Sequence, residues 1–135
     1  MEYLDKINNL IEDFSFFDTW EEKYEYIIDM GKKLPPMDDA LKTDETKVKG
    51  CMSQVWLVGF NDGDKITFVA DSDAIIVKGL IGLLMKIFNG ATKQEINNTD
   101  INDLFAKLGL DKNLAGTRRN GLASMVNKIK EYASH

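Results

Sequence analysis

Residues 54–70 read QVWLVGFNDGDKITFVA. The stretch holds two runs rich in β-branched and aromatic residues, 54–60 and 66–70, on either side of the turn-forming residues 61–64. Two such runs joined by Asn, Asp and Gly are typical of a β-hairpin. A further short strand around residues 46–49 would make the sheet three-stranded. We therefore predict a small antiparallel sheet of about three strands in the middle of the chain.

Helical patterns flank this hairpin. Apolar residues at helical spacing predict a helix over about residues 2–13, and a capping-box pattern at Thr19 starts a second helix that ends before Pro35-Pro36. Residues 37–49, poor in large apolar side chains, are expected to form a surface loop. Asp71, Ser72 and Asp73 supply capping side chains for the helix predicted next.

That helix spans Ala74–Phe88 and is almost wholly apolar. Gly79 and Gly82 within it cost helix propensity, about 1 kcal/mol each relative to alanine, so another backbone is expected to approach closely there. Shorter helices should follow from Thr92 and over residues 102–108, and a C-terminal helix is marked by Leu122, Met125, Val126, Ile129 and Tyr132. The order predicts one α+β domain over residues 1–135, with helices packed on the sheet.

Composition excludes several function classes. The chain has 135 residues, with 22 acidic against 17 basic ones and a net charge of -5, which disfavours nucleic acid as a partner. The acidic N-terminus is unlike a signal peptide, and the apolar run 74–88 is too short to span a bilayer. With a single cysteine, the chain cannot form an internal disulfide. We expect a cytoplasmic protein without a membrane segment.

The single cysteine, Cys51, lies where the predicted loop meets the first strand. Gly50 permits a turn there, which would present the thiol at a loop tip. Lys47 and Lys49 are expected to favour the thiolate by proximity of charge. The alternative is that Cys51 is a small buried apolar residue with a structural role, as many free cysteines are.

Four stretches, in order, resemble the motifs of the SufE family of sulfur acceptors. Residues 48–57, VKGCMSQVWL, are similar to the family pattern V-x-G-C-x-S-Q-V-W-L, and residues 71–80, DSDAIIVKGL, to D-S-D-A-x-I-V-K-G-L. Arg118 to Met125 resembles R-x-N/Q-G-L-x-x-M, and Trp20 to Tyr24 resembles W-x-x-K-Y. Met52 departs from the polar Gln found in several members. The resemblance covers essentially the whole chain and implies an α+β fold like those of SufE and IscU.

The resemblance also implies a function. Cys51 would accept sulfur as a persulfide from a SufS-like, pyridoxal-phosphate-dependent cysteine desulfurase and pass it to the SufBCD scaffold for iron–sulfur cluster assembly. The chain would thus be an accessory protein that speeds the desulfurase, not an enzyme, and would need no cofactor of its own. Neither the physiological desulfurase nor the choice between monomer and homodimer follows from the sequence.

Three motif residues are candidates for supporting roles. Arg118 matches the family arginine before the C-terminal helix, and its guanidinium would stabilise a thiolate or persulfide, or pair with the desulfurase; the alternative is an ordinary surface arginine. Asp73 fits a helix cap, which we favour, or an acidic contact with the partner. Gly50 supports a loop that shields Cys51 in the free protein and exposes it on partner binding.

Three other functions are alternatives to sulfur acceptance. A cysteine hydrolase needs a nearby base, and the only histidine, His135, ends the chain. A zinc or iron–sulfur site needs several convergent Cys or His ligands, which one cysteine does not supply, so we expect elemental analysis to find no stoichiometric metal. A non-catalytic interaction module with a structural cysteine is the remaining alternative.

Overall fold

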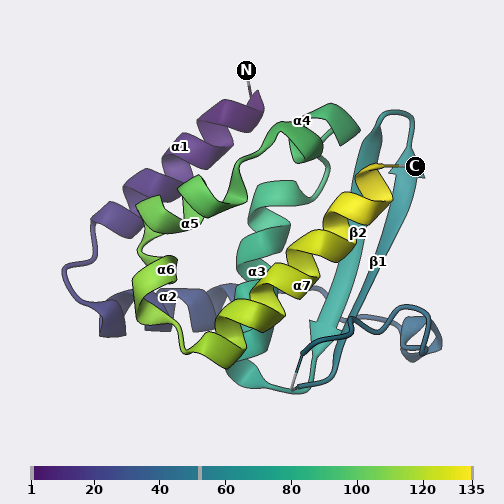
Figure 1. The fold of residues 1–135 in the computed structure, drawn as a ribbon, viewed down its shortest axis with the longest axis horizontal. Coiled ribbons are helices and arrows are strands. Elements are labelled where there is room, and N and C mark those ends of the chain that lie inside the picture. The colour runs from purple at the N-terminus through teal and green to yellow at the C-terminus, as the bar shows by residue number, and fades with distance from the viewer. Residues whose placement is uncertain (1, 52, 135) are drawn as a thin grey trace.

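The computed structural model describes residues 2–51 and 53–134, and in this part of the chain the fold is α+β. The elements, in chain order, are α1 (Glu2–Ser15), α2 (Trp20–Lys32), the 3₁₀ helix η1 (Asp39–Leu41), β1 (Val55–Asp62), β2 (Lys65–Ser72), α3 (Ile75–Phe88), α4 (Lys93–Asn98), α5 (Ile101–Leu108), α6 (Leu110–Asn113) and α7 (Gly116–Ala133). The helices lie around α3, and the hairpin stands at one end beside α7 (Figure 1).

The predicted hairpin is present. β1 pairs with β2 in antiparallel register from Val55 opposite Ser72 to Asp62 opposite Lys65. The two-residue turn between them contains Gly63, whose φ of 65° is left-handed and favours glycine. Inward-facing residues alternate along β2, so that Ile66, Phe68 and Ala70 are buried.

The predicted third strand is reduced to an isolated bridge. Lys47 pairs with Trp56, supported by hydrogen bonds from Val48 N to Val55 O (2.7 Å) and from Leu57 N to Thr46 O (2.9 Å). Among the described residues the sheet therefore has two strands. Beyond Val48 the chain turns at Gly50, whose φ is 88°, and then enters β1.

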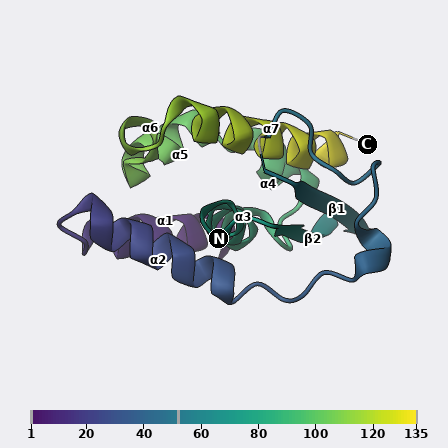
Figure 2. The same cartoon turned by 90° about the horizontal axis from the view of Figure 1, so that it is seen from below.

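Helix α3 is the centre of the core. Its fully buried side chains include Leu80, Ile81, Leu83, Leu84, Ile87 and Phe88. Burial of one such side chain contributes about 1.5–3 kcal/mol. Seen from below, α3 lies between α1 and α2 on one side and the layer of α4 to α7 on the other (Figure 2). The near-continuous apolar sequence of α3 follows from this burial on several sides.

The glycines of α3 allow α2 to approach at backbone distance, as predicted. A Cβ built on Gly79 would lie 2.6 Å from the carbonyl oxygen of Ile27, and one on Gly82 would lie 2.7 Å from that of Met30. Gly31 of α2 faces Gly79, since its Cβ would lie 2.6 Å from the Gly79 nitrogen. These close contacts hold α2 in a fixed position against α3.

The helix boundaries partly follow the sequence signals. Thr19 caps α2 through the Glu22 N–H, and Thr92 and Glu95 form the full capping box of α4. Helix α3 begins at Ile75, and its N-cap, Ala74, has no side-chain cap. Helix α6 was not predicted. Helix α7 begins at Gly116, well before the apolar pattern that marked it, because its first turns are mostly exposed.

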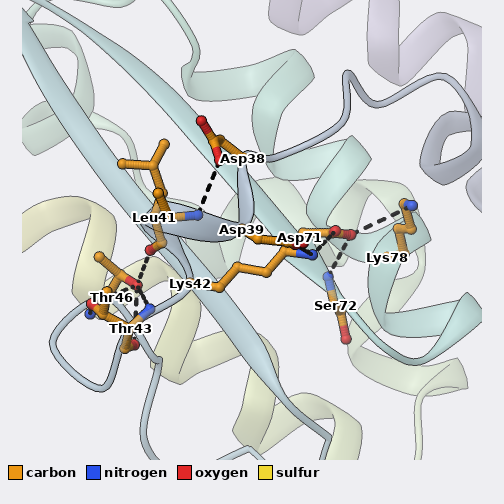
Figure 3. Close-up of polar contacts among 10 residues, drawn as sticks. Asp38, Asp39, Leu41, Lys42, Thr43, Thr46, Asp71, Ser72 and Lys78 are labelled. Atoms are coloured by element: carbon orange, nitrogen blue, oxygen red, sulfur yellow. Dashed lines mark hydrogen bonds and ion pairs between the residues drawn. The ribbon is translucent and has the colours of Figure 1, made fainter.

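The segment between α2 and β1 is tied to the hairpin by a charged cluster. Asp71 of β2 pairs with Lys42 (3.1 Å) and with Lys78 of α3 (3.4 Å) (Figure 3). Lys42 also lies over the ring of Trp56, 5.3 Å from its centroid. In addition, Met37 and Val48 are buried, so the predicted surface loop is anchored at both ends.

Candidate functional site

Cys51 lies on the connection that leads into β1, and its side chain points toward helix α7. The thiol is half-buried, and Sγ donates to the carbonyl oxygen of Gly121 at 3.6 Å. A Cβ on Gly121 would lie 3.5 Å from that sulfur, so the absence of a side chain at this position leaves space around the thiol.

The thiol opens on a cavity of about 240 Å³ between α3 and α7. Three parts of the chain line it: Cys51 and Ser53 from the connection, Ala74, Ile76, Val77 and Leu80 from the start of α3, and Thr117, Arg118, Gly121, Leu122 and Met125 from α7. The α3 wall is apolar. The sequence motifs around Cys51, Asp73 and Arg118 thus meet at one site although they are far apart in the chain.

Burial raises the pKa of the Cys51 thiol. The prediction that Lys47 and Lys49 favour the thiolate is therefore wrong for this conformation. No effect of their charges offsets the loss of hydration that raises the thiol pKa. Both lysines line a different cavity, of about 610 Å³, that also contains Asp44 and Glu45. In this state a smaller fraction of the thiol is ionised at a given pH, which makes it a weaker nucleophile.

The turn that the sequence predicted at Gly50 is present. The glycine's φ of 88° lies in the left-handed region, which costs other L-residues roughly 1–2 kcal/mol. A Cβ there would also lie 2.7 Å from Oγ of Ser124 on α7. Gly50 therefore combines an unusual backbone angle with a close approach to α7, and both direct Cys51 into the cavity.

Arg118 lies at the mouth of this cavity. The sequence suggested that Arg118 precedes the C-terminal helix. In the structure it lies within the first turns of α7. The side chain is exposed, lines the cavity with Cys51, and donates from Nη1 to the Tyr24 hydroxyl at 3.4 Å. The structure thus brings Arg118 and Cys51 to one cavity.

Asp73 does not cap α3, and that prediction is wrong. Its Oδ1 accepts the backbone N–H of Gln54 at 3.1 Å, while the Asp73 N–H donates to the Gln54 carbonyl at 3.4 Å. Ser72 Oγ donates to the same carbonyl at 2.7 Å. Since Gln54 is three residues beyond Cys51, these bonds hold the start of β1 against the end of β2 and do not engage the helix.

Three residues at or near the site were not singled out from the sequence: Gly121, Tyr24 and Ser124. Gly121 and Tyr24 stand inside motifs that carried the family resemblance, so position within a motif was the available signal. Ser124 gave no signal, because its closeness to Gly50 arises only from packing. Met52 and His135 lie outside the described residues.

Residues 2–51 and 53–134 contain no group of three or more His, Cys, Asp or Glu side chains arranged to hold a metal ion. No described helix combines the length and apolar character that crossing a membrane requires.

The solved structure of a hypothetical protein from Thermus thermophilus, determined in solution, has the same fold. It is 18% identical, with a TM-score of 0.79, and the match covers 96% of this chain and 93% of that one. At this identity the likeness concerns the fold alone.

Sequence relatives are closer. An uncharacterized SufE-like protein of Rhizobium meliloti (strain 1021) is 45% identical over 131 residues, or 94% of each chain. One of Rhizobium etli is 42% identical over 135 residues, covering 97% of this chain and 91% of the relative. The model of the SufE family, described as an Fe-S metabolism associated domain, matches residues 8–133. Together with the meeting of its motifs at Cys51, these matches show that the chain belongs to the SufE family.

Proposed function

We propose that Cys51 accepts sulfur as a persulfide from a pyridoxal-phosphate-dependent cysteine desulfurase. Membership of the SufE family supports a sulfur-transfer role with such an enzyme. The observation that carries the assignment to this residue is the position of the chain's one cysteine, with its thiol on a cavity that could receive an added sulfur atom.

The transfer is a thiol–disulfide exchange in which atoms and charge balance. The Cys51 thiolate attacks the outer sulfur of the desulfurase persulfide, a new S–S bond forms on Cys51, and the desulfurase cysteine leaves as a thiolate. Neither an external oxidant nor a reductant is consumed in this step. An acceptor on the SufBCD scaffold then attacks the outer sulfur of Cys51 in the same manner, so that both partners use one site in turn.

The resting geometry favours storage over reaction. With its pKa raised by burial and its proton directed to the Gly121 carbonyl, the thiol is a poor nucleophile. Attack on a persulfide held in another protein therefore requires the connection around Gly50 to move outward. A desulfurase favours that exposed state only if it binds it more tightly than the shielded one.

Mass spectrometry tests the proposal. The purified protein is incubated with cysteine and a cysteine desulfurase, and the peptide that contains Cys51 is expected to gain the mass of one sulfur atom, which dithiothreitol removes. Cys51→Ser should gain no sulfur and should not speed the desulfurase. If Cys51→Ser stimulates the enzyme fully, or if no cognate desulfurase transfers sulfur to the wild type, the acceptor role is refuted and an interaction module with a structural cysteine is favoured.

A further inference from the structure

The Arg118 guanidinium is held by a single hydroxyl. Among the described residues Arg118 forms no ion pair, and its side-chain hydrogen bond runs from Nη1 to the Tyr24 hydroxyl at 3.4 Å. An exposed arginine without such a partner samples many rotamers, and fixing its planar group costs side-chain entropy. The Tyr24 hydroxyl therefore restricts where the charge of Arg118 lies.

Tyr24 is itself held in position by packing, so that its hydroxyl restricts the Arg118 side chain. The ring is half-buried on α2 and meets the edge of Trp20, with 6.3 Å between ring centroids. Helix α2 is fixed on α3 by the backbone contact between Gly31 and Gly79. Since α3 forms the apolar wall of the Cys51 cavity, Tyr24 is fixed relative to that wall, whereas Arg118 is on the opposite side of the cavity in α7.

Arg118 is the one charged side chain among the described residues that line this cavity. The segment of Cys51 contributes Ser53, α3 contributes only apolar side chains, and α7 adds Thr117 and apolar residues besides Arg118. An added sulfur extends the side chain by about 2 Å beyond Sγ. The outer sulfur of a Cys51 persulfide would carry its negative charge into a space where this guanidinium supplies the positive charge.

We propose that Tyr24 is a positioning residue, whose hydroxyl holds Arg118 at the mouth of the cavity so that the guanidinium stabilises the anionic outer sulfur of a Cys51 persulfide. The inference rests on the proposed function, because it assigns a role in the persulfide state. It predicts that loss of the Tyr24 hydroxyl weakens this stabilisation although Tyr24 does not itself contact the sulfur.

The test uses a persulfide made without any desulfurase. The mixed disulfide of Cys51 with 2-nitro-5-thiobenzoate is treated with hydrosulfide, which displaces the aromatic thiolate and leaves one added sulfur on Cys51. The rate of alkylation of that persulfide by iodoacetamide is then measured against pH. The midpoint of the profile gives the apparent pKa of the outer sulfur in the folded protein.

The variants are Tyr24→Phe, Arg118→Ala and their combination. Tyr24→Phe should raise the apparent pKa of the persulfide by about half a unit, an effect reduced by solvent exposure of the arginine. Arg118→Ala should raise it further, and the double variant should equal Arg118→Ala, because the hydroxyl acts only through the guanidinium. Phenylalanine keeps the ring and its contact with Trp20, so thermal unfolding should stay close to that of the wild type.

Tyr26→Phe is the matched control. It removes the same hydroxyl from the same helix, but that hydroxyl bonds to Asp13 (3.3 Å) and Lys86 (3.4 Å), neither of which lines the cavity. Its persulfide should titrate like the wild type. The proposal is overturned if Tyr24→Phe titrates like the wild type, or if Tyr24→Phe raises the pKa equally with and without Arg118.

These outcomes are separable from the proposed function. Failure of a desulfurase to load Cys51 would refute the acceptor role while the chemically prepared persulfide still reports on Tyr24. An unshifted Tyr24→Phe would refute the positioning role and leave the acceptor role untouched.

Discussion

The carboxylate of Asp73 accepts the backbone N–H of Gln54, with 3.1 Å between Oδ1 and N. This bond joins the residue after β2 to the residue before β1, three positions from Cys51. It therefore links the conformation of the Cys51 connection to the hairpin and α3. A motif residue that looked like a helix cap instead helps to hold the segment of Cys51 in place.

Replacement of Asp73 by Ala should loosen that segment. Loss of one hydrogen bond typically costs about 0.5–1.5 kcal/mol, and exposure of Asp73 places the expected loss at the lower end. Alkylation of Cys51 by iodoacetamide should become faster than in the wild type, measured with the loss of free thiol over time.

Asp73→Asn is the control, because its side-chain oxygen still accepts a hydrogen bond but carries no charge. It should protect Cys51 like the wild type. If Asn protects the thiol fully but fails to stimulate a desulfurase, the charge of Asp73 serves as a partner contact. If Cys51 is alkylated as fast in Asp73→Asn as in Asp73→Ala, the hydrogen-bond role is contradicted.

Replacement of Gly50 by Val should impair sulfur acceptance more than folding. The left-handed φ of 88° costs a side chain roughly 1–2 kcal/mol, and the added Cβ meets Ser124 Oγ. Both effects displace the segment that carries Cys51, while the buried core is untouched. Persulfide formation with a desulfurase and the urea midpoint of unfolding measure the two effects separately.

Gly63→Val supplies the matched comparison. Gly63 also has a positive φ, 65°, but no described atom lies within 4 Å of a Cβ built there. It should lose similar stability and accept sulfur normally. Equal acceptance by Gly50→Val and Gly63→Val would show that the position of Gly50 has no bearing on transfer.

The raised pKa of Cys51 predicts two pH effects. The thiol should be alkylated more slowly in the folded protein than in a urea-unfolded control, with its rate profile displaced to higher pH. For stability, the unfolded chain loses the thiol proton first as pH rises. Stability is thus fully retained below the ordinary thiol pKa and falls as pH rises above it.

Cys51→Ala isolates this contribution, since other groups titrate in the same range. Urea unfolding at several pH values gives the free energy of unfolding of both proteins. At alkaline pH that of the wild type should fall relative to that of Cys51→Ala. A difference that is constant with pH would mean that the thiol pKa is the same in both states.

The lowered pKa of Asp71 predicts the opposite dependence of stability on pH. Burial opposes ionisation of its carboxylate, but the hydrogen bond from Lys42, the Ser72 N–H and the charge of Lys78 outweigh it, so that the pKa of Asp71 is lowered. Its stabilising effect is present above the ordinary carboxyl pKa and is lost as pH falls through the lowered value.

Asp71→Asn should therefore flatten the acid limb of the stability profile. It should also increase amide exchange over residues 38–46, because Lys42 would lose its tie to β2. Lys107→Gln, which breaks the exposed pair with Asp103 (3.0 Å), is the control and should change neither quantity. An unchanged acid limb in Asp71→Asn would remove the cluster's assigned role in the anchoring of this segment.

Local signals predicted the elements whose causes are local. The hairpin followed from two β-rich runs around a turn, and α4 followed from the capping box of Thr92 and Glu95, which is complete within four residues. The glycines of α3 correctly indicated that another backbone approaches this helix, but not that the backbone belongs to α2. Helix α6 and the early start of α7 were missed because exposed helical turns have little apolar periodicity.

By itself, the sequence determined the α+β class, the family resemblance and the choice of Cys51, since a lone cysteine within an ordered set of motifs can be read without coordinates. Tertiary structure decided what surrounds that cysteine. It placed the Asp73 carboxylate where it accepts the Gln54 N–H, and it placed Lys47 and Lys49 at another cavity. It also brought Arg118 within hydrogen-bond distance of Tyr24, which is far from it in the chain. The physical reason is that burial and electrostatic contact depend on distances between residues far apart in sequence, which no local pattern encodes.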